Sequence, residues 1–170
     1  MSYRIDMSAW NDERRWRDLT LGESCPICVQ GGPRDIVAEL EIAWVTAQEH
    51  APMRGYACLV FRRHAVEFHD LSADEAAAYM RDVQKLSSAV AAITGAVKMN
   101  YEVHGNTLPH LHMHFFPRYR GDPFEGGPID SRRMNTPVYS GDEYHTFVER
   151  LRDALLRGSP RRTPPVRRSW

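Results

Sequence analysis

The 170-residue sequence is poor in cysteine, carries no net charge and contains no long apolar run. Its three cysteines are too few for a disulfide framework. Lysine plus arginine and aspartate plus glutamate number 22 each, so overall charge does not indicate a nucleic-acid or membrane partner. No stretch approaches the roughly 20 apolar residues of a membrane span, and the N-terminal MSYRIDMSAW lacks the core of a signal peptide. We therefore expect a cytoplasmic protein without a membrane or nucleic-acid partner.

The apolar content of 42% is enough to build a core, and a chain of this length is typical of one domain. Runs of β-branched and aliphatic residues predict strands at 35–46 (one strand or two), 56–62, 97–103 and 110–116. Helical spacing of apolar residues predicts helices at 8–20, begun by Ser8, at 72–94, begun by a Ser72–Glu75 capping box, and at 143–156. Because strands and helices do not alternate regularly, we expect an α+β fold with an antiparallel sheet.

Three histidines, His110, His112 and His114, alternate with apolar residues in the segment HLHMHFF. A period of two is typical of a strand, so the imidazoles are expected on one face and the apolar side chains in the core. The row is open to three interpretations: the polar face of an edge strand, a three-histidine zinc centre, or imidazoles with separate roles along a phosphate chain. Strand geometry places the Cα atoms of His110 and His114 about 13 Å apart, which disfavours a shared metal.

HLHMHFF resembles the signature of the histidine triad (HIT) family of nucleotide hydrolases and transferases. The resemblance extends over about residues 23–120. It includes the basic segment that ends at His64, the Fhit-like stretch HAVEFHDL at 64–71, and Pro117-Arg118-Tyr119, which follows the triad as in bacterial members. It implies a HIT-like fold, in which a long helix packs on a five-stranded antiparallel sheet, and a homodimer. Helices at both ends of the chain are added to that core.

The expected organisation has four parts. They are an N-terminal helical extension (1–22), the HIT domain (23–120), a loop and C-terminal helix packing on that domain (121–157), and a basic, proline-rich tail (158–170). The tail is interpreted as a solvated terminus, in preference to a role in holding phosphate or RNA. The loop within 121–140 either covers the site or connects two elements.

Cys25 and Cys28 have the spacing of half a tetrahedral zinc site, and with no second CxxC, histidines must complete it. Resemblance to zinc-bearing HIT proteins and to galactose-1-phosphate uridylyltransferase implies His64 and His110 as the other ligands. The expected cofactor is thus a structural zinc ion, with no organic cofactor. The alternative is a pair of reduced, metal-free thiols. Cys58 is interpreted as a small buried hydrophobic residue.

The family mechanism implies separate roles for the triad histidines. His112 attacks the α-phosphorus as a neutral imidazole, and its other ring nitrogen donates to a main-chain carbonyl of the same strand. His114 donates a hydrogen bond to phosphate oxygens, whereas His110 and His64 orient the site or hold zinc. The remaining histidines, His104 among them, are interpreted as surface or turn residues.

The resemblance also implies substrate contacts. The phosphate contacts are expected from Asn100, Asn106 and Thr107. Ile42 and Trp44 are candidate base contacts, and Thr46 lies where many relatives hold the ribose with Asn or Asp. Arg62-Arg63 replaces the family's Pro-Lys, and either adds charge near the phosphates or solvates the strand end.

The leading hypothesis is a hydrolase or nucleotidyltransferase that cleaves dinucleoside polyphosphates or nucleoside phosphoramidates through a nucleotidyl-histidine. The alternatives are a dinucleoside polyphosphate phosphorylase and a nucleotide-binding sensor or adaptor with incidental turnover. The physiological substrate, base preference and acceptor are left open.

Overall fold

The computed structural model describes residues 9–130 and 137–157. The strands are β1 Ile36–Glu39, β2 Ala43–Thr46, β3 Ala57–Phe61, β4 Lys98–Glu102 and β5 His112–Arg118. The helices are α1 Glu13–Thr20, α2 Pro26–Gln30, α3 Ala73–Thr94 and α4 Glu143–Arg157, with 3-10 turns at Ala9–Asn11 and Phe68–Asp70. No helix among the described residues is long and apolar enough to cross a membrane.

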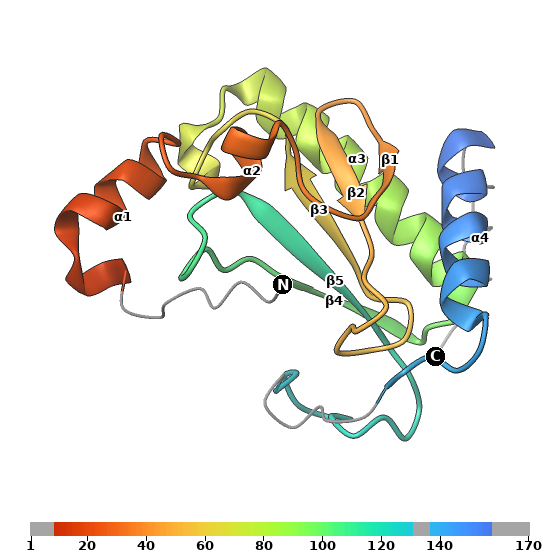
Figure 1. The fold of residues 1–170 in the computed structure, drawn as a ribbon. Coiled ribbons are helices and arrows are strands. Elements are labelled where there is room, and N and C mark those ends of the chain that lie inside the picture. The colour runs from red at the N-terminus through yellow and green to blue at the C-terminus, as the bar shows by residue number, and fades with distance from the viewer. Residues whose placement is uncertain (1–8, 131–136, 158–170) are drawn as a thin grey trace, which may run out of the picture.

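All strand pairs are antiparallel and the sheet order is β1-β2-β3-β5-β4, which confirms the expected α+β fold (Figure 1). β3 lies in the middle and every one of its residues is buried, as its apolar sequence requires. The segment 35–46, expected as one strand or two, forms two strands joined by a tight turn. The carboxylate of buried Asp82 in α3 accepts hydrogen bonds from the backbone of Glu41 (3.1 Å) and Ile42 (2.9 Å), which fixes this turn against the helix.

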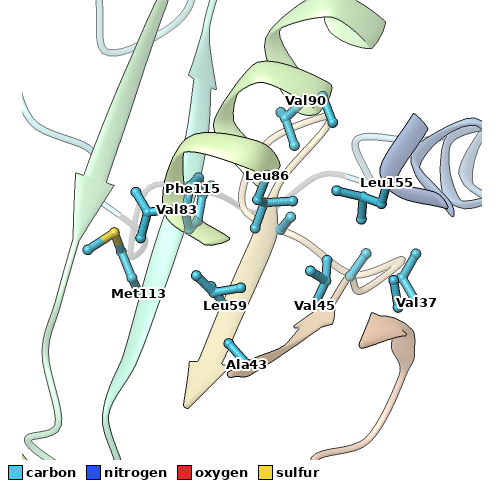
Figure 2. Close-up of a cluster of buried hydrophobic side chains, with 14 of the residues drawn as sticks. Val37, Ala43, Val45, Leu59, Val83, Leu86, Val90, Met113, Phe115 and Leu155 are labelled. Carbon is cyan, nitrogen blue, oxygen red and sulfur yellow. The ribbon is translucent and has the colours of Figure 1, made fainter. Parts of the chain in front are cut away.

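Helix α3 covers one face of the sheet and encloses the core (Figure 2). It begins at the predicted capping box, where the Ser72 hydroxyl accepts from the Glu75 backbone N–H. It ends at Gly95, whose φ of 69° lies in the left-handed region that glycine adopts without strain. Leu59 and Phe115 from the sheet pack here with Leu86 from α3, and α4 contacts both α3 and β1. The other face of the sheet carries a smaller hydrophobic cluster, which includes Cys58, Val60 and Phe116, beside the polar side chains.

The N-terminal helix differs from its expected bounds. α1 begins at Glu13, because the Asp12 carboxylate accepts a 3.0 Å hydrogen bond from the Arg15 N–H and caps the helix. The preceding residues form a 3-10 turn, and the expected cap Ser8 lies outside the described residues, as does the tail at 158–170. In Figure 1, α1 extends away from the sheet. The four-part division of the chain stays a prediction.

Candidate functional site

The sheet face opposite α3 gathers several of the predicted site residues. Residues paired across antiparallel strands point to the same face. Trp44 in β2 and His112 in β5 both pair with Val60 of β3, and Thr46 and His114 both pair with Cys58. Asn100 of β4 pairs with Phe116 on the same face. The register thus brings together residues from three separate segments of the sequence.

His112 has the orientation of a nucleophile. Its Nδ1 lies 2.6 Å from the main-chain carbonyl oxygen of His110, and a carbonyl can only accept a hydrogen bond. Nδ1 therefore carries the proton and Nε2 keeps its lone pair. Burial lowers the pKa of His112, which favours the neutral ring. The ring is half-buried on the polar face, whereas its neighbours Leu111 and Met113 belong to the core.

His114 lies beside His112, and the centroids of the two rings are 4.8 Å apart. Burial, together with the nearby rings of His112 and His104, lowers the pKa of His114 to about 4. Both rings are therefore neutral at pH 7. The Nδ1 of His114 lies 2.7 Å from the hydroxyl oxygen of Tyr56.

The position of His110 departs from the expectation of three imidazoles on one surface. β5 begins at His112, and His110 is only 1% exposed. The Leu111 N–H donates to the Ala65 carbonyl at 2.7 Å and its carbonyl accepts from the Phe61 N–H at 3.0 Å, so the chain is held by the segment that follows β3. The His110 ring is therefore buried beside Cys25 and Cys28 rather than exposed with the other two rings.

Cys25, Cys28, His64 and His110 form one cluster, in which the four candidate ligand atoms lie within 4.8 Å of one another. The Nδ1 of His110 lies 3.4 Å from Cys25 Sγ and 3.6 Å from Cys28 Sγ, and His64 Nδ1 lies 3.3 Å from Cys28 Sγ. Bonds of about 2.3 Å to sulfur and 2.0–2.1 Å to nitrogen give a sulfur-to-nitrogen edge of about 3.5 Å in a tetrahedral zinc site. These residues therefore fit a tetrahedral metal ion.

The other ring nitrogens of the two histidines are held by carbonyls, as is usual for metal ligands. His110 Nε2 lies 2.7 Å from the Phe61 oxygen and His64 Nε2 lies 2.9 Å from the Thr20 oxygen, so both donate and the Nδ1 lone pairs face the sulfurs. Gly22 packs so closely that a Cβ there would lie 2.9 Å from His64 Cγ, and its φ is +84°. Partial burial and the Cys25 thiol raise the pKa of Cys28 to about 11, so binding a metal as thiolate releases protons.

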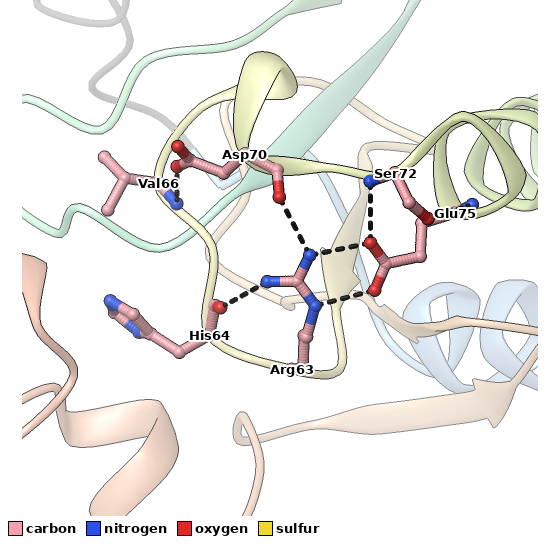
Figure 3. Close-up of polar contacts among 6 residues, drawn as sticks. All are labelled: Arg63, His64, Val66, Asp70, Ser72 and Glu75. Carbon is pink, nitrogen blue, oxygen red and sulfur yellow. Dashed lines mark hydrogen bonds and ion pairs between the residues drawn. The ribbon is translucent and has the colours of Figure 1, made fainter.

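The two arginines before His64 bind protein groups rather than extending over the histidine face. The Arg63 guanidinium contacts both carboxylate oxygens of Glu75 at 2.6 and 2.7 Å, and donates to the carbonyls of Asp70 (2.9 Å) and His64 (3.0 Å), as Figure 3 shows. Arg62 donates to the Glu41 carbonyl. Arg63 therefore links the segment that carries His64 to the start of α3.

A cavity of about 540 Å³ opens beside His114. Its lining residues include Tyr56, Glu102, His104 and Ile129. The Glu102 carboxylate lies 3.1 Å from His104 Nε2, and the His104 ring centroid is 5.7 Å from that of His114. The sequence patterns did not indicate Tyr56, Glu102, His104 or Ile129 as site residues. Alternation from Asn100 through residues 102 and 104 indicates a shared face, but only the pairing of β4 with β5 shows which face it is.

The other predicted substrate contacts are more scattered. Asn106 is exposed and Thr107 half-buried in the loop between β4 and β5. Ile42 lies at the β1–β2 turn, against the core on the α3 side, and Trp44 packs on the opposite, histidine-bearing side. Asn100 lines a separate cavity of about 470 Å³ bounded by the loop at 125–128.

That loop is held by the buried ion pair of Arg118 with Asp122, both oxygen contacts being 2.8 Å. Arg118 also donates to the Gly127 carbonyl at 3.0 Å and to the Phe124 carbonyl. The guanidinium lowers the pKa of Asp122 to about 2. Part of the segment 121–140 thus packs next to the histidine face.

The comparisons with known proteins agree with this geometry. The HIT domain family model matches residues 31–121, more than half of the chain, and the protein belongs to the HIT family. None of the curated proteins compared with the chain matches it.

Solved structures of similar fold include a histidine triad protein from Bradyrhizobium japonicum. It is 29% identical, with a TM-score of 0.63, over 71% of this chain and 89% of that one. A Zn-bound histidine triad protein from Mycobacterium smegmatis is 20% identical, with a TM-score of 0.57, over 79% and 95%. Plasmodium falciparum diadenosine triphosphate hydrolase, in complex with cyclomarin A, is 11% identical, with a TM-score of 0.55, over 74% and 78%. The expected family and its HIT-like fold are confirmed.

Proposed function

We propose that this protein cleaves dinucleoside polyphosphates or nucleoside phosphoramidates at the α-phosphate through a covalent nucleotidyl-histidine on His112. The observation that carries the proposal is the 2.6 Å contact of His112 Nδ1 with the His110 carbonyl, which leaves the Nε2 lone pair available on a half-buried, neutral ring. A protein that only binds nucleotides has no need of such a nucleophile.

In the first step, Nε2 of His112 forms a bond to the α-phosphorus while the bond from that phosphorus to the leaving oxygen or nitrogen breaks. The electron pair of the broken bond leaves with the departing group. His114 donates a hydrogen bond to the phosphate or leaving group as charge develops. In the second step, water attacks the phosphorus, the P–N bond breaks with its electrons returning to Nε2, and a proton is released to solvent with the nucleoside monophosphate.

The proposed substrate contacts are those that the resemblance to the HIT family implies. We propose that Asn100, Asn106 and Thr107 bind phosphate oxygens. Trp44 contacts the base, and Thr46, with a single hydroxyl, lies near the ribose. Ile42 packs against the core on the α3 side, so it is not included among the base contacts. The diadenosine triphosphate hydrolase of similar fold supports dinucleoside polyphosphates as the first substrates to test.

We propose that Zn²⁺ occupies the cluster of Cys25, Cys28, His64 and His110. The Zn-bound relative supports this identity, and so does the preference of zinc for thiolate and imidazole ligands. When bound, the ion is structural, because all four positions are taken by side chains of the chain. Its thiolates are typical of a reducing compartment, which supports the cytoplasmic location expected from the sequence.

We also propose a homodimer joined through β4 and α3. β4 is an edge strand of the sheet, and an uncovered edge is a template for pairing with another chain. Exposed apolar side chains border it: Met80 is 48%, Val97 58% and Tyr101 45% exposed. A second copy on this edge removes these side chains from water.

The test is a panel of diadenosine triphosphate and adenosine 5′-phosphoramidate in ¹⁸O-labelled water, with products identified by mass spectrometry. We expect AMP carrying one ¹⁸O, and His112→Ala is expected to lose at least about 10³-fold in kcat while still binding nucleotide. The matched control His69→Ala removes an imidazole whose side chain is 83% exposed and should keep wild-type turnover.

Wild-type-like hydrolysis by His112→Ala contradicts the covalent mechanism. When phosphate is added, a phosphorylase instead converts diadenosine triphosphate to ADP alone and the phosphoramidate to ADP, with no labelled AMP. Tight nucleotide binding without turnover of any substrate by the wild type identifies a sensor.

A further inference from the structure

Tyr56 is a buried residue that has no assigned role in the mechanism above. It directly precedes β3 and is only 7% exposed. Its hydroxyl oxygen lies 2.7 Å from Nδ1 of His114, and the two rings stack with centroids 5.9 Å apart and planes at 25°. Phe116 packs against both rings, with its centroid 5.2 Å from that of Tyr56 and 6.0 Å from that of His114. The hydroxyl is therefore held in one place relative to the imidazole.

The direction of this hydrogen bond follows from the other groups near the hydroxyl. Burial raises the pKa of Tyr56 far above its usual range, so the phenol keeps its proton. The thiol of Cys58 is another neighbour of the hydroxyl, and its sulfur is a weak acceptor. The imidazole nitrogen is the stronger acceptor. The phenol O–H therefore donates to Nδ1, and the single proton of the neutral His114 ring sits on Nε2.

We propose that Tyr56 is a positioning residue that fixes the tautomer and ring orientation of His114, so that His114 presents an Nε2–H donor to the reacting phosphate or leaving group. The inference rests on the proposed function, in which His114 supplies that hydrogen bond. The phenol transfers no proton. It acts through His114, whose ring centroid is 4.8 Å from that of His112.

The first measurement needs no variant. Imidazole ¹⁵N chemical shifts of the zinc-loaded wild-type protein are expected to show His114 Nδ1 as an unprotonated acceptor and Nε2 as protonated. Protonation of Nδ1 in the wild type overturns the inference.

The second measurement compares Tyr56→Phe with Tyr144→Phe. Both variants lose one tyrosine hydroxyl, but that of Tyr144, in α4, donates to the Ala47 carbonyl (2.9 Å) and not to His112 or His114. We expect Tyr56→Phe to lower kcat about tenfold, the effect of losing one neutral hydrogen bond, with KM changed less than twofold. Its ¹⁵N spectrum should show loss of the acceptor signature at Nδ1. Tyr144→Phe should match the wild type in both measurements.

Failure of the proposed function and failure of the role of Tyr56 give different results. If the wild type turns over no substrate, the proposed function is wrong, and the ¹⁵N spectrum still reports the tautomer. If the wild type forms products through His112 but Tyr56→Phe retains both its kcat and the Nδ1 acceptor signature, only the role of Tyr56 is wrong. Melting temperature and zinc content, measured on both variants, detect a folding defect, and in that case the wild-type spectrum decides the question.

Discussion

Removing the metal from the proposed zinc centre is expected to destabilise the protein strongly, because the four ligands join distant parts of the chain. Cys28 and His64 are 36 positions apart, and Cys25 and His110 are 85 apart. Closing a loop of 36 residues restricts the unfolded chain by about 4 kcal/mol in the chain-entropy treatment of cross-links. At about 2–4 °C per kcal/mol for a chain of this size, the apo protein should melt about 8–16 °C lower.

The assay combines elemental analysis of protein purified without added metal with melting curves before and after chelation. We expect about one zinc per chain. Cys28→Ser should lose the metal and melt like the chelated protein. Cys58→Ala is the matched control, since Cys58 lies outside the cluster, and it should keep one zinc. Hydrogen exchange should become faster in α1 and α2 on chelation, because His64 Nε2 holds the Thr20 carbonyl. A metal-free preparation whose melting temperature does not respond to chelation refutes the reasoning.

Two further predictions concern charge. The pKa of His114 is lowered to about 4 and that of His112 is also lowered, so the neutral rings persist below the ordinary imidazole pKa, and the decline of kcat/KM with falling pH should be centred below that value. A decline centred at the ordinary imidazole pKa of about 6.5 contradicts this. Asp122→Asn leaves Arg118 buried without its carboxylate and should lower the free energy of unfolding by about 3 kcal/mol in a denaturant titration. Unchanged stability rejects a structural role for the ion pair.

Local patterns in the sequence were sufficient to predict most of the helices and strands. The capping box at Ser72 and the helical spacing of apolar residues placed α3, because both signals act within one or two helical turns. The two-residue alternation correctly placed Leu111, Met113 and Phe115 in the core. The CxxC spacing identified half of the metal cluster, and the resemblance to zinc-bearing relatives supplied the two histidines that the structure brings to it.

These local patterns could not predict contacts between residues that are distant in the sequence. A period of two shows that neighbouring side chains alternate, but it does not show what covers them. Cys25, Cys28 and the Phe61 carbonyl, all distant in the sequence, contact His110, which is buried. Likewise, the contact of Tyr56 with His114 spans 58 positions and depends on the register of β3 against β5. Each local element has several ways to pack, and burial of the core on α3 selects one of them. The sequence therefore determined which residues are candidates for the chemistry, whereas the packed sheet determined which of their atoms meet.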